Sequence, residues 1–257
     1  MLIMHTAKQN RLLAALPEEV QDRLSPYLER VPLTAGQVVY DAGQPRRYVY
    51  FPIDSIVSLI NVTQSGSSAG ISMVGNEGMV GIASFMGGER SPWRVIVQNG
   101  GSAYRLLGQR MRDEFERHGA TLQLMLRYAQ ARSAQMAQTA ACNRHHSIDQ
   151  QLCRWLLLSL DRLTSNQLSM TQESIANTLG VRREGVTDAA GKLQKLGVIS
   201  YHRGSISVLD RPRLEKMSCE CYAAVKSETD RLLPPRIPMR DIAPRPRWAP
   251  MGDMLPA

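Results

Sequence analysis

Three consecutive side chains, Arg182, Arg183 and Glu184, carry hydrogen-bonding groups that can read base pairs. The fork of donors on the Arg183 guanidinium matches O6 and N7 of guanine, and the Glu184 carboxylate can accept from the amino group of cytosine. Arg182, beside them, can reach a phosphate. These residue types in this order predict contact with double-stranded DNA.

A helix over residues 182 to about 196 is predicted to position these side chains. At about 100° per residue, its apolar residues fall within about 120° of one another; they are Val186, Ala189, Ala190, Leu193 and Leu196. The opposite arc holds Arg183, Glu184, Thr187 and Asp188. We therefore expect a helix that buries one side and offers the other to a partner.

A shorter helix is predicted just before it. Thr171 can cap a helix that begins at Gln172, and Gly180 can adopt the left-handed conformation of a helix stop after Leu179. Two helices joined by a tight glycine turn form a helix-turn-helix. The rival explanation is a pair of core helices in an unrelated fold.

The next segment weakens that rival. Residues 197–201 and 205–208 read as two strands joined at His202–Arg203–Gly204, which predicts a β-hairpin wing with Arg203 at its tip, near phosphate. The predicted DNA-binding residues are Thr171, Gln172, Arg182, Arg183, Glu184, Thr187, Asp188 and Arg203.

The first half of the chain has a different character. From Gly36 to Leu107, β-branched and aromatic runs are separated by glycines, which predicts short strands in an antiparallel barrel or sandwich. Residues 10–30 read as one or two short helices.

A long helix is expected from Met111 to about Ala141, where Gly119 is the only glycine and proline is absent. Its apolar stripe comprises Leu122, Met125, Leu126, Ala129, Met136 and Ala140. The stripe either packs on the chain's own barrel or forms a two-fold dimer seam, and its narrow width favours the seam.

Composition excludes several classes of protein. The sequence has no run of about 18 apolar residues, so no membrane span is predicted. Met1 to Gln9 lack the apolar block of a secretory signal, so a cytoplasmic location is expected. No catalytic serine elbow, phosphate loop or paired-carboxylate motif occurs, so we expect no enzyme. The formal charge of +8 favours a polyanionic partner, but the excess is spread over the whole chain.

The four cysteines permit two further hypotheses. Cys142, His146, Asp149 and Cys153 would share a helix face with metal-ligand spacing. A helix cap at Asn143 or Ser147 would break that face, so buried thiols are favoured and no metal site is predicted. Cys219 and Cys221 are expected to face different directions, with redox sensing as the alternative.

The segments Met170–Gly180 (MTQESIANTLG) and Val181–Ile199 (VRREGVTDAAGKLQKLGVI) resemble the winged-helix signature of the Crp/Fnr superfamily of bacterial transcription regulators. The resemblance extends from about residue 10 to 230. It implies an α+β fold with a cyclic-nucleotide-binding-like antiparallel β-roll at 10–110, a long dimerisation helix and hinge at 111–145, and a winged helix-turn-helix at 146–230. Proline and arginine dominate 234–257, which we expect to be a disordered tail.

The resemblance further implies a homodimer that binds a palindromic operator, with RNA polymerase as another partner. In the family's recognition helix an Arg-Glu pair is followed four residues later by a basic residue, and here that position holds Asp188. The alternative is a ligand-sensing module whose winged helix binds a protein.

The resemblance places the ligand candidates at Gly81, Ile82, Arg90 and Ser91. Cyclic-nucleotide binders in this fold hold the ribose with a glutamate where this chain has Ile82, and isoleucine cannot form that bond. Glu77 is the alternative acid, but it lies farther from Arg90 than the family pattern allows. A cyclic nucleotide, another small ligand and no ligand all stay open, with the first disfavoured, and no cofactor is expected. No cysteine precedes Cys142, which excludes the family's N-terminal iron-sulfur cluster.

Overall fold

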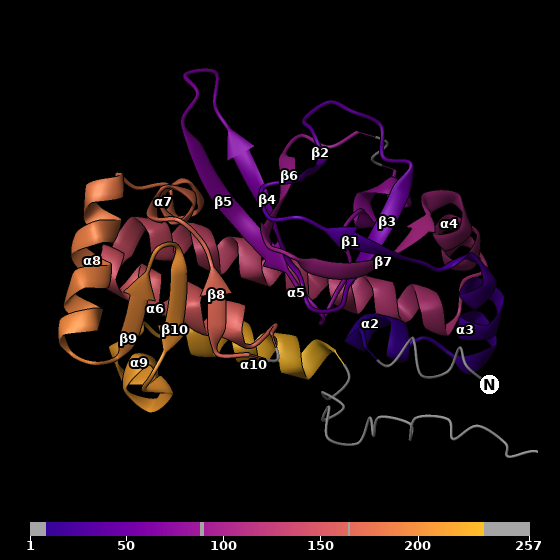
Figure 1. The fold of residues 1–257 in the computed structure, drawn as a ribbon. Coiled ribbons are helices and arrows are strands. Elements are labelled where there is room, and N and C mark those ends of the chain that lie inside the picture. Colours follow the sequence, from indigo (N-terminus) through magenta and orange to yellow (C-terminus); the bar gives the residue numbers. More distant parts are fainter. Residues whose placement is uncertain (1–8, 88–89, 164, 234–257) are drawn as a thin grey trace, which may run out of the picture.

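The computed structural model describes residues 9–87, 90–163 and 165–233, and it shows a β-roll and a helix-rich lobe carried along one long helix (Figure 1). This order confirms the predicted α+β fold, with an N-terminal antiparallel roll, a long helix and a C-terminal winged helix-turn-helix. The tail predicted for residues 234–257 lies outside the described residues.

From residue 9 onward, three short helices precede the roll: α2 (Arg11–Ala14), α3 (Glu18–Leu24) and η1 (Ser25–Tyr27). The side chain of Asn10 connects α2 to the roll. Its Oδ1 accepts from the backbone N–H groups of Leu12 and Leu13, and its Nδ2 donates to the carbonyls of Pro52 and Gly78, each at 2.8 Å. One buried amide thus caps a helix and joins it to two segments of the roll.

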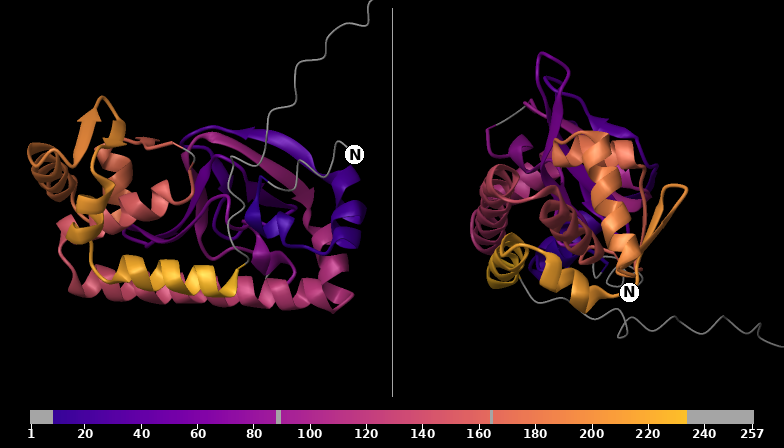
Figure 2. Two further views of the ribbon diagram at one scale, coloured as in Figure 1. Left: turned by 90° about the horizontal axis from the view of Figure 1, so that it is seen from below. Right: turned by 90° about the vertical axis from the view of Figure 1, so that its left-hand side faces the viewer.

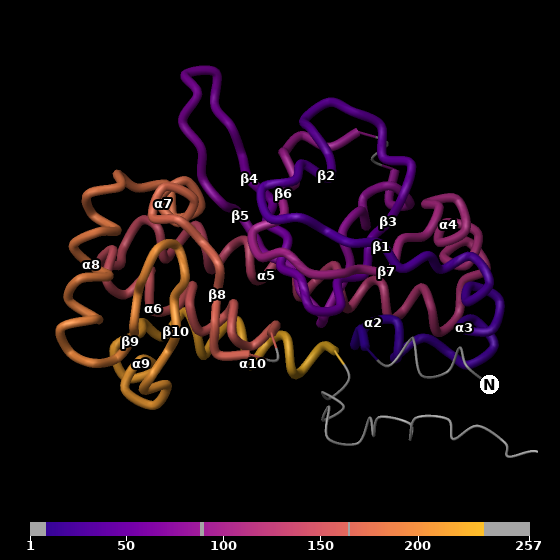
Figure 3. The backbone as a smooth tube through the Cα atoms, in the orientation of Figure 1, coloured from indigo at the N-terminus to yellow at the C-terminus, as the bar shows by residue number. Residues whose placement is uncertain are grey.

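The roll consists of two antiparallel sheets. The first has the order β1 (Glu29–Leu33), β7 (Gly101–Leu107) and β3 (Tyr48–Pro52). The second has the order β2 (Val38–Tyr40), β6 (Arg94–Asn99), β4 (Ile56–Val62) and β5 (Ser68–Val74), and η2 (Ile82–Ser84) lies between β5 and β6 along the chain. The hairpin of β4 and β5 rises beside the C-terminal lobe, as the chain trace shows (Figure 3).

Two helices follow the roll, where the sequence predicted one. They are α4 (Gly108–Glu116) and α5 (Ala120–His145). His118 and Gly119 separate them, because both have left-handed backbones with φ of 62° and 75°. The 26 residues of α5 span about 39 Å.

One face of α5 packs on its own roll through Leu124, Met125 and Tyr128, which are almost fully buried. Met125 therefore packs on the roll, which is the disfavoured of the two explanations for the predicted stripe. The other stripe residues stay at least partly exposed, and Leu126 is 44% exposed. The helix thus covers the roll and still presents an apolar side.

The C-terminal lobe contains five helices and a three-stranded sheet among the described residues: α6 (Ile148–Leu160), β8 (Gln167–Ser169), α7 (Gln172–Leu179), α8 (Arg183–Lys195), β9 (Ile199–His202), β10 (Ser205–Val208), α9 (Arg211–Met217) and α10 (Cys221–Leu232). The sheet order is β8-β10-β9. The last helix, α10, returns alongside α5, as two further views show (Figure 2). No helix within the described ranges is long and apolar enough to cross a membrane.

Helix α6 is the centre of this lobe. Ser147 and Gln150 form a capping box at its start, and the ten residues from Gln151 to Leu160 are all buried. Its core cluster also includes Ile56 and Met73 from the roll, so the two lobes share packing.

A buried ion pair joins the same two lobes. Arg162 Nε lies 2.7 Å from Glu77 Oε1, and both side chains are at most 7% exposed. Glu77 Oε2 also accepts from the Gly75 N–H, and Arg162 Nη1 donates to the Leu158 carbonyl. Both charged groups therefore have hydrogen-bonding partners inside the protein.

We expect Glu77→Gln to lower the free energy of unfolding by about 3–5 kcal/mol, because it leaves the Arg162 charge buried without its partner. The matched control is Glu29→Gln, since Glu29 pairs with Arg105 but is 59% exposed; its cost is expected below about 1 kcal/mol. Urea unfolding of both variants makes the comparison. Equal losses would contradict a special role for the buried pair.

Candidate nucleic-acid interface

The predicted helix-turn-helix forms from local sequence signals. Thr171 Oγ1 accepts from the Ser174 N–H at 3.1 Å and so caps α7. Gly180 ends that helix with a left-handed backbone, φ 69° and ψ 34°. A side chain would strain this position, so glycine sets the turn between the two helices.

The second helix, α8, lies against the lobe's core through Val186, Ala189, Ala190 and Leu193, each at most 3% exposed. Leu196, expected on the same side, is instead 42% exposed because it is the C-cap residue beyond the last helical turn. Arg182 is likewise the N-cap rather than the first helical residue.

The outer arc of α8 carries the predicted recognition residues, all of them at least partly exposed: Arg182, Arg183, Glu184, Thr187 and Asp188. Gln172 joins them from α7, because the Thr187 hydroxyl donates to Gln172 Oε1 at 2.8 Å. The two helices of the motif are thus linked on their outer side as well as through the core.

Charged side chains of α8 interact with neighbouring elements. Lys192 Nζ lies 3.0 Å from Asp149 Oδ2 and ties the helix to α6. At the other end, burial raises the pKa of Tyr201, and the positive charge of Arg183 partly offsets this rise. Tyr201 belongs to β9, so Arg183 acts electrostatically at the junction of recognition helix and wing.

The wing is a tight hairpin, as predicted. Ser205 pairs with His202, which leaves Arg203 and Gly204 as a two-residue loop with φ of 46° and 81°. Two successive left-handed residues are typical of a type I′ hairpin turn. Arg203 is exposed at this tip.

Two predicted residues also face the β-roll. Thr171 and Arg203 line a cleft of about 480 Å³ whose opposite wall includes Arg94 and Gln98. The lobes touch beside it, because Gln98 Nε2 donates to the Thr178 hydroxyl and the Ser169 N–H donates to Asn99 Oδ1. The other six predicted residues lie outside this cleft and are at least partly exposed, whereas Thr171 and Arg203 line it.

The ligand candidates lie in the segment between β5 and β6. Gly81 has a left-handed backbone with φ 102°, and Ile82 packs against the roll's core. Ser91 is buried and donates to the Trp93 carbonyl at 2.6 Å, and Arg90 is exposed and donates to the Gly43 carbonyl at 3.3 Å. Ile82 thus offers no polar group to a ribose.

The substitute acid, Glu77, is engaged elsewhere. Both of its carboxylate oxygens have internal partners, Arg162 and the Gly75 N–H. Neither candidate residue, Ile82 or Glu77, therefore offers an available carboxylate to the ribose of a cyclic nucleotide.

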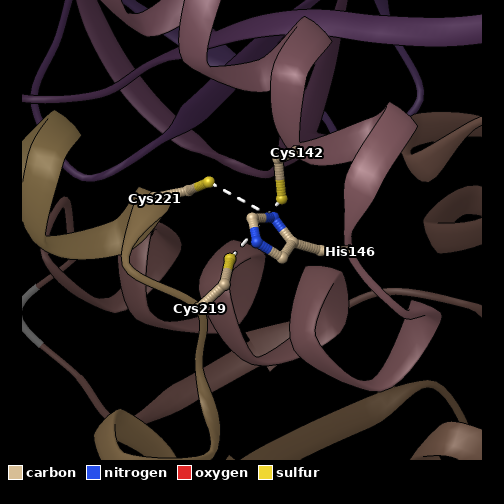
Figure 4. Close-up of side chains that lie close together, drawn as sticks. All are labelled: Cys142, His146, Cys219 and Cys221. Atoms are coloured by element: carbon tan, nitrogen blue, oxygen red, sulfur yellow. Dashed lines mark hydrogen bonds between the residues drawn. The ribbon is translucent and has the colours of Figure 1, made fainter.

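A cluster of possible metal ligands shares only Cys142 and His146 with the set considered from the sequence. Cys142, His146, Cys219 and Cys221 bring one ligand atom each to within 4.8 Å of one another (Figure 4). Asp149, expected beside Cys142, instead pairs with Lys192. The available signal was a Cys-x-x-x-His followed much later by Cys-x-Cys, and only the fold brings the two motifs together.

Burial governs the thiols of this region. It raises the pKa of Cys142 to about 12 and that of Cys153 also to about 12. The charge of Arg154 opposes this shift at Cys142. Burial also raises the pKa of Cys219.

Two protein-family models match this chain. Residues 150–217 match the Crp-like helix-turn-helix domain, and residues 30–118 match the cyclic nucleotide-binding domain. The matched ranges coincide with the winged-helix lobe and the β-roll.

Individual proteins show the same organisation. The Global nitrogen regulator of Synechococcus elongatus is 22% identical over 214 residues, covering 79% of this chain and 95% of that protein. The structure of FixK2 from Bradyrhizobium japonicum has a TM-score of 0.62 at 14% identity, covering 75% of this chain and 98% of that chain. A CRP-family transcriptional regulator from Thermus thermophilus, TTHB099, has a TM-score of 0.60 at 17% identity, covering 74% and 96%.

We expect Thr171→Ala to lower the free energy of unfolding by about 1 kcal/mol, because the Ser174 N–H loses its acceptor. Thr171→Ser keeps a hydroxyl at the cap and is expected to stay within about 0.5 kcal/mol of the native chain. Chemical denaturation of the two variants provides the measurement. An alanine variant as stable as the serine variant would show that this cap contributes nothing.

Proposed function

Because the chain belongs to the Crp/Fnr superfamily of transcription regulators and carries a helix-turn-helix DNA-binding domain, we propose that two copies of it bind one palindromic operator. The observation that carries the proposal is the outer arc of α8, which starts at Arg182 and Arg183 and is exposed along its polar side. The other side of the same helix is packed against the core, so the arc is a rigid surface that can enter the major groove.

Arg183 and Glu184 are the proposed base-reading pair. Arg183 would donate to a guanine, and Glu184 would accept from a cytosine amino group. Arg182 and Arg203 would contact phosphates on either side. Asp188 is repelled by phosphates, so it would act at a base edge, where it accepts from cytosine or adenine.

The dimer would form along α5. One side of this helix follows the spacing of a helix pair, with intervals of four, three, four, three and four residues; the series is Leu122, Leu126, Ala129, Ser133, Met136 and Ala140. The helix α10 packs elsewhere on α5, where Gln138 Nε2 donates to Cys221 Sγ. This apolar side is therefore available to a second copy, which would set the two α8 helices on one face.

We infer that the β-roll does not hold a cyclic nucleotide in the manner of the family. The family resemblance places Ile82 at the position of the ribose-binding glutamate, and Glu77 is paired with Arg162. Modulation by another small ligand and contact with RNA polymerase stay predictions from the family resemblance.

The direct test is a fluorescence-anisotropy titration of a duplex enriched from genomic fragments by the native chain. Arg183→Ala is expected to weaken binding by about 1 to 3 kcal/mol for each half-site. Arg30→Ala is the control, since Arg30 is an exposed arginine on the far roll sheet; it should leave the affinity unchanged.

Salt dependence separates this proposal from a winged helix that binds a protein. Phosphate contacts make the logarithm of the binding constant fall linearly with the logarithm of salt concentration. Weak binding that is indifferent to sequence and identical for the native chain and Arg183→Ala would overturn the proposal.

We expect Leu126→Glu to convert the dimer to a monomer, because it places a charge in the middle of the apolar side of α5. Light scattering after size exclusion would then report the chain mass of 28.6 kDa in place of twice that value. Arg127→Glu, a change at an exposed residue on the side of α5 away from this seam, should leave the dimer intact. A folded Leu126→Glu variant that remains dimeric would contradict this seam.

A further inference from the structure

We propose that Cys142, His146, Cys219 and Cys221 bind one zinc ion, which joins the end of α5 to the start of α10. All four ligand atoms lie within 4.8 Å of one another, and three of the four residues are buried (Figure 4). The inference does not depend on DNA binding, so its test can fail while the proposed function stands.

The spacing of the donors matches a tetrahedral zinc site. Zinc binds thiolate sulfur at about 2.3 Å and imidazole nitrogen at about 2.0–2.1 Å, so neighbouring donors in a tetrahedron lie about 3.5–3.8 Å apart. The Sγ atoms of Cys142 and Cys219 are 3.6 Å apart, and Cys221 Sγ lies 3.4 Å from His146 Nδ1. These separations need little change to receive the ion.

The local fold explains why the four donors converge. Cys142 and His146 are one helical turn apart at the end of α5, so both project to the same side. The expectation that Cys219 and Cys221 face different directions is wrong, because Cys219 lies before α10 and Cys221 is its first residue. The bend between them turns both sulfurs toward α5.

The imidazole has an outer partner that orients it. His146 Nε2 lies 3.1 Å from Glu220 Oε1, so a proton on Nε2 is donated to the carboxylate. The lone pair of Nδ1 then faces the sulfurs. A carboxylate behind a ligating histidine is a common arrangement in zinc sites, because it fixes the ring and its tautomer.

The surroundings also suit the charge of three thiolates. Gln138 Nε2 donates to Cys221 Sγ at 3.0 Å, which stabilises a thiolate there. Three thiolates, one neutral imidazole and Zn²⁺ sum to a single negative charge, and the electrostatic influence of Arg154 on Cys142 opposes that charge. Soft sulfur donors with one imidazole select zinc over calcium or magnesium.

An ion at this site would affect how α5, α6 and α10 are held together. His146 caps the end of α5, and Ser147 caps the start of α6. A bound ion would therefore hold the bend from the long helix into the winged-helix lobe and fasten α10 against it. Folded and metal-bound states are coupled at such a site.

The test uses the full chain without an affinity tag, reduced, reconstituted with zinc chloride and desalted before metal analysis by mass spectrometry. We expect close to one zinc ion per chain for the native sequence and none for Cys219→Ser. Cys153→Ser is the matched control, because Cys153 is a buried thiol outside the cluster, and it should retain the ion. Glu220→Gln should bind zinc about 10–100-fold more weakly.

Cobalt substitution of the native chain provides a readout that needs no variant. We expect the intense visible bands and thiolate charge-transfer absorption of a tetrahedral cobalt-thiolate site. The proposal is overturned by a reduced native chain that takes up no zinc, by a weak octahedral cobalt spectrum, or by Cys219→Ser holding as much zinc as the native chain.

Discussion

The structure depends on the burial of α6 on every side. Ten consecutive residues from Gln151 to Leu160 are removed from water, and a helix that is covered all round must be enclosed by other elements. Helices α8, α9 and α10 pack against it. A close approach occurs at Gly185, where an added Cβ would lie 2.6 Å from Ile148 Cδ1. The exposed arc of α8 is a consequence, because the helix has one side committed to α6 and only the other can meet a partner.

The same helix links the two lobes. Its core cluster takes in Ile56 and Met73 of the β-roll, and Arg162, just after its end, forms the buried pair with Glu77. Thr178 of α7 bonds to Gln98 of the roll. Packed interiors do not deform continuously, so a change in the roll's second sheet would be transmitted to the helix-turn-helix as a rearrangement of these contacts. These contacts physically connect the roll to the helix-turn-helix lobe.

Local signals in the sequence predicted the functional elements well. The cap at Thr171, the turn at Gly180 and the hairpin at Arg203 each depend on a few neighbouring residues, and the structure has all three. The sequence-based predictions are wrong where contacts between residues far apart in the chain determine the structure. Periodicity could not separate the face of α5 that covers the roll, which includes Met125, from the face that stays exposed. The cluster at Cys142 and Cys219 joins residues 77 positions apart, and no local pattern reports that distance. Gly119 did signal the break before α5, but a lone glycine is also tolerated within helices.

The central claim is that two copies of α8 read one operator with two-fold symmetry. The sequences of duplexes that the full-length chain enriches from random DNA test it most directly. The account predicts two inverted copies of one half-site with centres about 10 base pairs apart, or a multiple of that spacing. Enrichment of a single motif without an inverted copy, or no enrichment above the starting pool, would contradict it.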